Sequence, residues 1–552
     1  MGRHGRFHPL GGCSFLMELD SLAAVMDSAS LLRERRLPGV LDVVAAARTV
    51  LVRCDSPASA QQARAVLSRP GPVRGAPVRG ARHSLDTVYD GADLAHAAQL
   101  AGLGADALVR WHAGQEWVAA FGGFAPGFMY LAPSERALNI PRQAVPRTVV
   151  PAGSVAVGGE FSAIYPSSTP GGWQLLGRCA DPLWDPGRAQ PALIQPGDKV
   201  RFKAVRELVH LGAASKESCA GGTAAAPGTS GTQNRSGLEI LAPGVFSTVQ
   251  DLGRPGHAHL GVTGSGALDR PALRRANRMV GNAPARGRSP GAAGLELVLG
   301  GLRVRARGTQ LLAVAGTSLR LIIDRGTTEP YGAPLNAPFL LPDGAVLSVE
   351  ALPPHPGLRS IVAVRGGVAV PPVLGSRATD VLSGLGPPVV GAGTFLPTGG
   401  TTAVGPVGFP EPAPAAAASL AEATLLRFTS GPRGDWFTAG SLSAFGQQNW
   451  HVGVQSNRIG LRLQLPGPAG RSPAGGSGQP LARTAAHRGL ELPSEGILEG
   501  SIQVPPSGLP VVFLADHPVT GGYPVLGVVV AEDLAKAAAL APGAAVRFAA
   551  LG

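Results

Sequence analysis

The sequence has 552 residues, a formal net charge of +12 and only four cysteines. One hydrophobic core serves at most roughly 250–300 residues, so we expect several domains. The basic residues are scattered, which argues against nucleic-acid binding. The cysteines lie far apart, which argues against a disulfide or zinc framework. No apolar stretch approaches the ~20 residues of a membrane span, which argues against a membrane protein.

Glycine and proline are abundant, with 78 and 51 copies, and the hydrophobic residues come in short runs. Because Gly and Pro break helices and supply turns, we predict a mainly β fold with α+β parts. Acidic residues at 18, 20 and 27 interrupt the N-terminal apolar segment. This pattern is not that of a signal peptide, so we expect a cytoplasmic protein.

In chain order, residues 39–53 predict two strands around a turn, between helices at 22–36 and 60–67. These elements make a small α+β unit over residues 1–82. A helix over 93–112 opens the next domain, residues 83–210. Segment 211–237, rich in Ala, Gly, Ser and Thr, predicts a flexible linker. Two lobes follow, 238–426 and 427–552, with Pro-rich or Gly-rich stretches at 409–423 and 466–479.

An internal repeat links the two halves. Thr169-Pro-Gly-Gly-Trp-Gln-Leu-Leu-Gly177 matches Val519-Thr-Gly-Gly-Tyr-Pro-Val-Leu-Gly527 in its turn, aromatic residue and strand. Each copy is followed by a Pro-Gly turn and a Val-Arg-Phe strand. We therefore predict two copies of one fold.

Standard nucleotide and metal signatures are missing from the sequence. None of the four lysines follows a Gly-rich loop, so any phosphate must be bound by backbone amides and arginine. No His or Cys cluster has metal-ligand spacing, and no Met precedes a Lys as in a biotin carrier. We expect neither a metal site built from clustered His or Cys residues nor covalent biotin.

Candidate ligand-binding residues in the first half surround Gly-rich turns. Arg142 and Arg147 precede a turn that ends at Ser154, and Gly171-Gly172 belongs to the repeat. A guanidinium beside exposed amides suits a carboxylate or phosphate. The alternative is that both arginines pair with structural carboxylates.

In the second half, Asp and Arg recur together. Asp251, Glu495 and Asp516 are candidate general bases or Mg²⁺ ligands, and Arg254, Arg377 and Arg458 are candidates to neutralise phosphate. Asp380 and His517 complete the candidate catalytic set, while Gln503, Thr520, Gly521 and Gly522 are candidate substrate or ATP contacts. The alternative is a set of turn-stabilising pairs. We expect Arg377, Arg458 and Asp516 to converge on a cleft that binds an anionic ligand.

Motifs in both halves resemble a known pair of subunits. The first half resembles PxpB of prokaryotic 5-oxoprolinase, the KipI or allophanate hydrolase subunit 1 family, at Phe124-Ala-Pro-Gly-Phe128, Pro141-Arg142, Pro146-Arg147, Val150-Pro-Ala-Gly-Ser154, Gly158-Gly159, Tyr165-Pro166 and Pro170-Gly-Gly-Trp173. The second half resembles PxpC, the KipA or subunit 2 family, at Thr248-Val-Gln-Asp-Leu-Gly-Arg254, Gly266-Ala-Leu-Asp269, Leu295-Glu296, Leu374-Gly-Ser-Arg377, Ser456-Asn-Arg458, Pro493-Ser-Glu-Gly496, Ile502-Gln-Val-Pro505 and Thr520-Gly-Gly-Tyr523.

The resemblance implies tandem cyclophilin-like β-barrel domains preceded by a small ferredoxin-like α+β unit. It also implies ATP, with Mg²⁺, and a PxpA-type (LamB/YcsF-like) partner for opening 5-oxoproline to glutamate. With this function, we expect Arg458→Ala to keep a near-native melting curve and to lose ATPase activity in the reconstituted complex. Urea carboxylase or allophanate chemistry and a KipI/KipA-like regulator of a sensor kinase stay open as alternatives, as do a homo-oligomer and the half that binds ATP. The sequence departs from the pattern at Gly12-Cys13-Ser14, in an extension within 282–295 and at Pro518-Val519.

Overall fold

The computed structural model describes residues 5–69, 80–143, 145–208, 236–285, 287, 289–316, 319–353, 357–400, 404–412, 422–466 and 478–551. The chain divides into two compact units. One comprises residues 77–121 and 126–235, and the other comprises Met1–Ala76, Gly122–Ala125 and Ser236–Gly552. The linker expected at 211–237 lies outside the described residues except for its last two positions, and much of the stretches at 409–423 and 466–479 also lies outside them.

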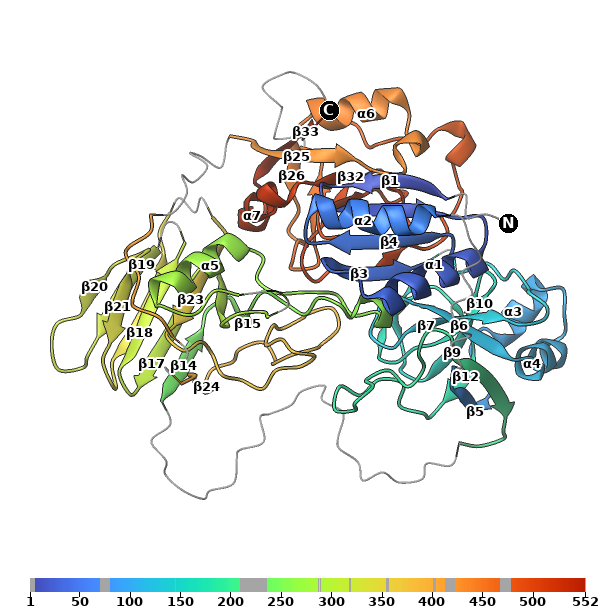
Figure 1. Ribbon diagram of the computed structural model, residues 1–552, viewed down its shortest axis with the longest axis horizontal. Coiled ribbons are helices and arrows are strands. Elements are labelled where there is room, and N and C mark those ends of the chain that lie inside the picture. The colour runs from blue at the N-terminus through green and yellow to red at the C-terminus, as the bar shows by residue number, and fades with distance from the viewer. Residues whose placement is uncertain are drawn as a thin grey trace. The chain divides into compact units, whose positions relative to one another are not determined.

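The N-terminal residues form a four-stranded antiparallel sheet in the order β1-β2-β4-β3 (Figure 1). Its elements are β1 Arg6–Leu10, β2 Ser14–Glu18, α1 Leu22–Arg35, β3 Val40–Ala45, β4 Thr49–Cys54 and α2 Pro57–Ser68. Ser21 and Ser56 cap the two helices through their hydroxyl groups. The order is that of a ferredoxin-like sheet in which β1 takes the place of the final strand. The predicted helices and strand pair of this unit are confirmed.

The unit that holds residues 77–121 contains a closed seven-stranded barrel in the order β10-β7-β6-β13-β5-β12-β9. Its elements are β5 Arg82–Val88, α3 Leu94–Leu100, α4 Ala105–Gly114, β6 Trp117–Gly122, β7 Met129–Pro133, β9 Ser154–Gly158, β10 Phe161–Ile164, β12 Gln174–Cys179 and β13 Lys199–Ala204, with a two-stranded ribbon of β8 Arg147–Val150 and β11 Thr169–Gly171. The single helix predicted over 93–112 is two helices, because Gly102 takes a left-handed φ of 67° between them.

A second closed barrel, in the order β25-β32-β29-β30-β27-β26-β33, lies near the C-terminus. Its elements are β25 Thr424–Ser430, α6 Ala439–Gln447, β26 Trp450–Val452, β27 Gly460–Gln464, β29 Ser501–Gln503, β30 Val511–Phe513, β32 Val525–Val529, α7 Ala531–Ala539 and β33 Ala545–Ala550, with a ribbon of β28 Glu495–Gly496 and β31 Thr520–Gly521. When the strands of each barrel are numbered in chain order, the two barrels have the same pattern of neighbouring strands. Each barrel also has one parallel pair, β5 with β13 in the first and β25 with β33 in the second. The predicted repeat is confirmed.

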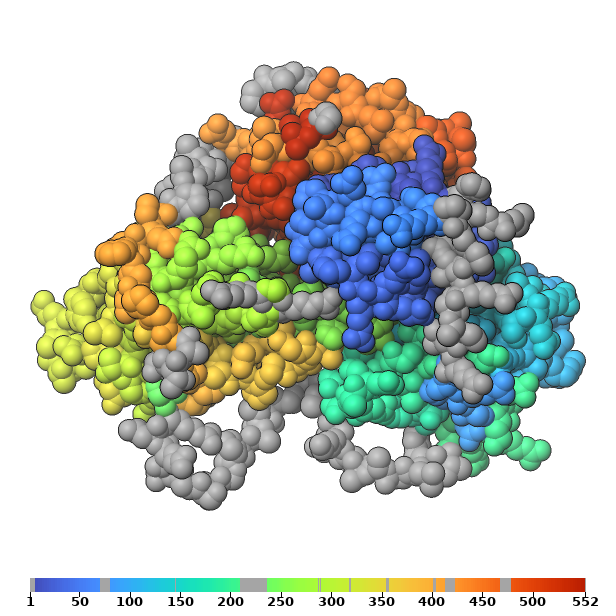
Figure 2. All heavy atoms as spheres, viewed as in Figure 1, coloured from blue at the N-terminus to red at the C-terminus, as the bar shows by residue number. Residues whose placement is uncertain are grey.

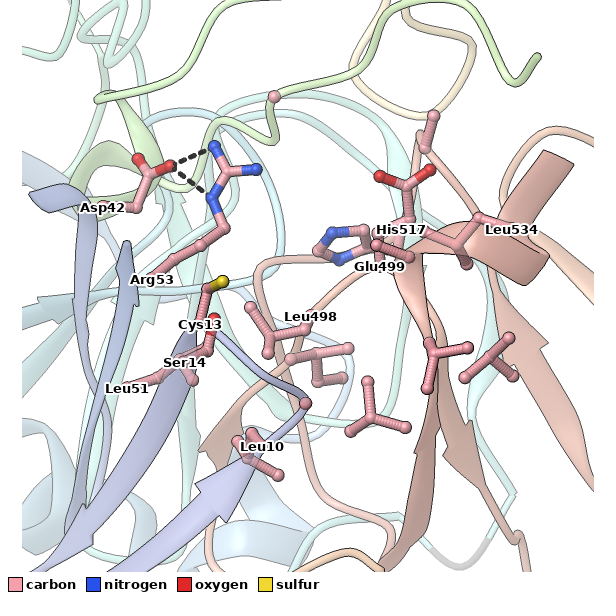
Figure 3. Close-up of a pocket in the computed structure, with 18 of the residues that line it drawn as sticks. Leu10, Cys13, Ser14, Asp42, Leu51, Arg53, Leu498, Glu499, His517 and Leu534 are labelled. Atoms are coloured by element: carbon pink, nitrogen blue, oxygen red, sulfur yellow. Dashed lines mark hydrogen bonds and ion pairs between the residues drawn. The ribbon is translucent and has the colours of Figure 1, made fainter. Parts of the chain in front are cut away.

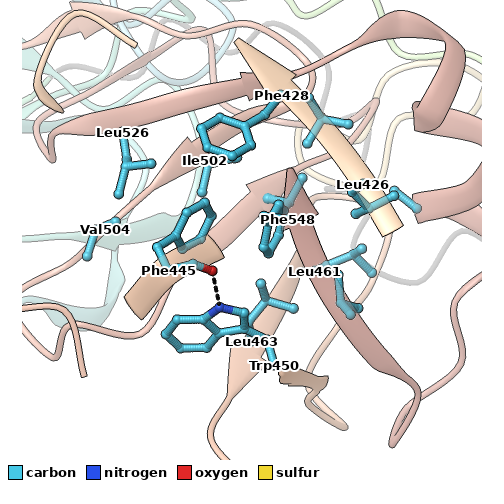
Figure 4. Packing of buried hydrophobic residues seen from close by; sticks show 14 of the residues in the cluster. Leu426, Phe428, Phe445, Trp450, Leu461, Leu463, Ile502, Val504, Leu526 and Phe548 are labelled. Carbon is cyan, nitrogen blue, oxygen red and sulfur yellow. Dashed lines mark hydrogen bonds between the residues drawn. The ribbon is translucent and has the colours of Figure 1, made fainter. Parts of the chain in front are cut away.

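The repeat extends into the two cores. In the first barrel Trp117 donates its indole N–H to the carbonyl of His112 (2.9 Å), and in the second Trp450 donates to the carbonyl of Phe445 (3.2 Å; Figure 4). The rings of His112 and Phe445 each lie 4.4 Å, between centroids, from the Phe of the closing strand. A buried histidine therefore occupies in one barrel the place of a phenylalanine in the other.

A two-sheet sandwich lies between the linker and the second barrel in sequence. Its elements are β14 Gly237–Pro243, β15 Phe246–Gln250, α5 Arg270–Met279, β16 Gly294–Val298, β17 Leu302–Arg307, β18 Gln310–Ala315, β19 Leu319–Asp324, β20 Tyr331–Ala333, β21 Pro338–Leu341, β22 Val346–Ala351, β23 Arg359–Val364 and β24 Phe395–Pro397. The two sheets share one apolar core, and α5 packs its apolar face on β18 and β23. No repeat motif marks this sandwich in the sequence.

The ferredoxin-like sheet packs against the second barrel. Leu10, Leu16 and Leu51 of the sheet share a buried apolar cluster with Leu498 and Val528 of the barrel. In Figure 2 the blue N-terminal residues accordingly lie against red C-terminal ones. This packing brings the turn between β1 and β2 beside barrel residues about 500 positions later in the chain. Among the described residues, no helix combines the length and apolarity that crossing a bilayer requires.

Candidate functional site

A pocket of about 420 Å³ opens where the ferredoxin-like sheet, the loop before α5 and the second barrel meet (Figure 3). This volume falls in the usual range for small-molecule sites. The apolar lining includes Leu10, Leu51 and Leu498. The polar lining comprises Cys13, Ser14, Asp42, Arg53, Thr263, Ser265, Arg270, Thr429, Glu499, His517 and the exposed Glu532. In Figure 3 the side chains of Arg53 and His517 face the same space.

Arg53 is held in place by Asp42. Its Nε and Nη2 atoms donate to Oδ2 of Asp42 at 3.1 and 2.7 Å. The other carboxylate oxygen of Asp42 accepts from the backbone N–H groups of Gly256 and Ala258, at 2.8 and 3.3 Å. The Nη1 atom of Arg53 makes no hydrogen bond to the described part of the chain, so it remains available to a ligand.

Arg270, the first residue of α5, is a second cation on the pocket. Its Nη2 lies 2.7 Å from Glu499 Oε2. Its Nε atom is buried and has no hydrogen-bond partner among the described residues. The Arg270 side chain as a whole is 25% exposed, so the accessible part of its guanidinium can contact a ligand in the pocket.

His517 is a neutral base on the pocket wall. Its Nδ1 donates to the carbonyl of Pro518 (2.8 Å), which leaves the lone pair on Nε2. Burial lowers the pKa of the imidazole, although the carbonyl of Pro518 and the carboxylate of Glu499 oppose this shift. His517 and Asp516 are neighbours in sequence, but only His517 lines the pocket.

Ser265 joins the pocket to a buried ionic network. The residue has a left-handed φ of 51°, which is strained for a side chain with a Cβ atom. Its hydroxyl donates to Asp516 Oδ1 at 2.6 Å. The serine oxygen therefore presents its lone pairs as an acceptor.

Arg458 is the centre of that network. Its Nε donates to Asp516 Oδ2 (2.9 Å), Nη1 to Glu296 Oε1 (2.5 Å), and Nη2 to Asp516 Oδ1 (3.1 Å) and to the carbonyl of Gly266 (2.7 Å). The arginine is 2% exposed. Every nitrogen of the guanidinium has a protein partner, so Arg458 is placed to hold the structure together rather than to contact phosphate.

Asp251, Arg254 and Asp380 lie beside this network. Asp251 accepts from the hydroxyl of Ser376 (2.6 Å) and the backbone N–H of Arg377 (2.6 Å). Arg254 donates to the carbonyl of Ala378, and its Nε and Nη1 have no partner in the described residues. Burial, followed by the charge of Asp516, raises the pKa of Asp380 to about 6.

The structure thus brings five of the eight candidate catalytic residues together, namely Asp251, Arg254, Asp380, Arg458 and Asp516. Arg377 joins them only through its backbone, because its Nε donates to the carbonyl of Val370. Glu495, Thr520 and Gly521 lie apart from these residues, in the ribbon formed by β28 and β31. Glu495 is paired there with Arg433. Gln503 donates to the carbonyl of Tyr523 next to that ribbon, and Gly522 follows β31.

In the first barrel, four of the five candidates surround ribbon β8/β11. Arg147 donates to Asp93 (2.6 Å) opposite Gly171 in the ribbon, and its Nη1 is buried without a partner among the described residues. Arg142 stacks on Trp173, 5.5 Å from the ring centroid, and Gly172 accepts from the backbone of Gln143. Ser154 begins β9 and makes no side-chain hydrogen bond within the described chain.

Each barrel has an ion pair at its ribbon, but the acidic and the basic residue exchange places between the two barrels. The backbone N–H of Asp93 donates to the carbonyl of Leu175. The backbone N–H of Arg433 donates to the carbonyl of Val525, which is the residue that matches Leu175 in the repeat. Their partners, Arg147 and Glu495, lie opposite the matching glycines Gly171 and Gly521. The repeat is therefore structural, whereas the chemistry at the two ribbons differs.

Several pocket residues carried no signal in the sequence. Asp42, Arg53, Ser265, Arg270 and Glu499 belong to no recognised motif, and their partners lie far away in the chain. Among the described residues, no group of three or more His, Cys, Asp or Glu side chains is placed to hold a metal ion. Three pocket residues did carry a signal, since Cys13 and Ser14 stand where the sequence departs from the family pattern and His517 was a candidate catalytic residue.

Comparison with known families gives two matches along the chain. The family described as "Carboxyltransferase domain, subdomain A and B" matches residues 260–550. The family described as "Carboxyltransferase domain, subdomain C and D" matches residues 6–194.

Individual relatives agree with these matches. The C subunit of 5-oxoprolinase from Escherichia coli K12 is 34% identical over 56% of this chain and 90% of its own length. The B subunit of 5-oxoprolinase from Escherichia coli O157:H7 is 47% identical over 23% of this chain and 59% of its own length. Urea amidolyase of Lachancea kluyveri is 30% identical over 56% of this chain but only 17% of its own length. The crystal structure of TTHA0988 aligns with a TM-score of 0.76 and 30% identity, over 97% of this chain and 99% of that one.

Proposed function

Since this chain belongs to the carboxyltransferase-domain family and is similar to the 5-oxoprolinase C subunit, we propose that it is the fused B and C component of an ATP-dependent 5-oxoprolinase. The observation that carries the proposal is the similarity of one polypeptide both to a 5-oxoprolinase C subunit and to a 5-oxoprolinase B subunit. In this proposal a PxpA-type subunit completes the enzyme. The substrate is 5-oxoproline and the product is glutamate.

The proposed reaction needs a phosphoryl group to activate an amide. Transfer of the γ-phosphoryl group of ATP to the lactam carbonyl oxygen releases ADP and activates the carbonyl carbon. Water then adds to that carbon and the ring C–N bond breaks, with the nitrogen leaving as the amine, which gives an acyl phosphate. A second water hydrolyses the acyl phosphate to glutamate and phosphate. The cluster of Arg142 and Arg147 beside Gly171-Gly172 is our candidate for contacting ATP, because Arg147 Nη1 is buried without a partner in the described residues. Arginine with backbone amides is a suitable phosphate site in a chain without a P-loop lysine.

Reconstitution tests the proposal directly. The purified chain, mixed with a PxpA-type subunit, ATP, Mg²⁺ and 5-oxoproline, should release glutamate and phosphate in equal amounts. Each protein alone should show neither product above background, because the activating and hydrolysing parts are divided between them. Coupled phosphate release and glutamate detection provide the measurement, and a mixture no faster than either protein alone would contradict the assignment.

A urea-type amide is the second candidate substrate class. The observation in its favour is the 30% identity to a urea amidolyase. The same reconstitution, repeated with urea in place of 5-oxoproline, separates the two classes. Phosphate release that depends on urea and not on 5-oxoproline would transfer the assignment to urea-type chemistry.

A further inference from the structure

The pocket in Figure 3 carries hydrogen-bond donors and acceptors in an arrangement that specifies the ligand more closely than the family does. Two arginines, Arg53 and Arg270, contribute N–H groups that the described chain leaves unpaired. Each guanidinium is fixed by a carboxylate, Asp42 or Glu499. Fixed guanidinium donors favour an anionic oxygen ligand, above all a carboxylate.

The same pocket offers acceptors for an N–H group. The Nδ1 of His517 is committed to the carbonyl of Pro518, so its Nε2 can only accept while the ring is neutral. The hydroxyl hydrogen of Ser265 is committed to Asp516, so its oxygen also accepts. Both residues line the cavity.

The remaining wall is apolar. Leu10, Leu51 and Leu498 are buried side chains that line the pocket and suit methylene groups. A ligand for this pocket thus needs three parts, namely a carboxylate, an amide N–H and a small hydrocarbon portion.

We propose that this pocket binds a small amide that carries a carboxylate, with the carboxylate on Arg53 and Arg270 and the amide N–H on His517 or Ser265. The assignment rests on the proposed function, because it places the substrate of that reaction in this pocket. It excludes neutral urea as the preferred ligand, since urea leaves the N–H groups of both arginines without an anionic partner. Arg270 is the specificity-determining residue, because Glu499 fixes its guanidinium and a quarter of its side chain stays exposed on the pocket.

Direct binding tests the proposal independently of catalysis. The full-length protein is titrated calorimetrically with 5-oxoproline, with 2-pyrrolidinone, which is the same ring without the carboxylate, and with urea, each with and without a non-hydrolysable ATP analogue. We expect 2-pyrrolidinone to bind at least tenfold more weakly than 5-oxoproline, and urea more weakly still, because charge-assisted hydrogen bonds are lost.

Substitution of Arg270 sharpens the test. Arg270→Met should weaken 5-oxoproline binding at least tenfold and leave 2-pyrrolidinone binding nearly unchanged. Arg274→Met, an exposed position on the same helix, is the matched control and should bind as the unmodified protein does. In the single variant Glu499 loses the cation with which it pairs. If that variant folds poorly, the double variant Arg270→Met with Glu499→Gln provides the test, because it also removes this carboxylate.

The outcomes separate this inference from the proposed reaction. Equal affinity for 5-oxoproline and 2-pyrrolidinone, no binding of 5-oxoproline, or an unchanged preference in the Arg270 variants would overturn the carboxylate site. If the preference is observed but the reconstituted mixture releases no glutamate, the carboxylate site stands and the reaction assignment fails. Glutamate release without the carboxylate preference would leave the reaction in place and reject the site.

Discussion

Replacing Arg458 with alanine is expected to destabilise the protein by about 3–5 kcal/mol, the usual cost of removing one partner from a buried ion pair. The guanidinium is 2% exposed and binds Asp516, Glu296 and the carbonyl of Gly266. Without it, two buried carboxylates lose their shared cation. Chemical denaturation of the purified variant, followed by circular dichroism, measures the change.

The matched control for this prediction is Arg462→Ala. Arg462 is exposed on β27, only four positions away, so its loss should change the stability by no more than about 0.5 kcal/mol. An Arg458→Ala protein with the same denaturation midpoint as Arg462→Ala would show that the network contributes little. The sequence alone led to the opposite expectation, a near-native melting curve, because it gave no indication that Arg458 is buried.

The repeat could be predicted because its markers are local. The Gly-Gly turn, the following aromatic residue and the Pro-Gly turn each lie within a few residues, so each copy is recognisable from sequence. The strands between these markers then follow the same path in both barrels. Local signals also located the two helices and the strand pair β3 and β4 of the N-terminal unit, but not β1 and β2.

The site could not be predicted in the same way, because its contacts are distant in sequence. Ser265 and Asp516 are 251 positions apart, and Arg458 and Glu296 are 162 apart. Motifs indicated that Arg377 and Arg458 were important but not where their side chains point. The former binds a backbone carbonyl and the latter is saturated by carboxylates. The pocket arginines were missed because neither belongs to a motif.

His112 shows how a residue that fits the repeat can differ in chemistry from its counterpart, Phe445. The imidazole is fully buried, its Nδ1 accepts from the hydroxyl of Tyr89 (2.7 Å) and its Nε2 donates to Ser162 (2.8 Å). Ser162 in turn donates to the carbonyl of Ala156, which fixes this direction. The site therefore holds a neutral ring, and burial lowers the pKa of His112 to about 3.

This pKa predicts that the barrel containing His112 becomes less stable in acid. The unfolded histidine has a pKa of about 6.5 and binds a proton before the folded one does, so the stabilisation is complete above pH 6.5 and is lost as the pH falls toward 3. By pH 4 the loss from this one residue should be about 3 kcal/mol. Urea denaturation at pH 7 and pH 4 measures it, with the fluorescence of Trp111 and Trp117, whose rings lie 6.1 and 5.0 Å from His112 between centroids.

The variant His112→Phe isolates this contribution, because phenylalanine already occupies the equivalent place in the second barrel. At pH 7 the variant should be less stable by about 1–3 kcal/mol, since the hydroxyl of Tyr89 loses its acceptor. Between pH 7 and pH 4 it should lose about 3 kcal/mol less than the unmodified protein, because it has no proton to bind. His96→Gln, at an exposed position of α3, is the control and should follow the unmodified protein. If His112→Phe and His96→Gln lose equal stability on acidification, His112 does not titrate as its burial requires.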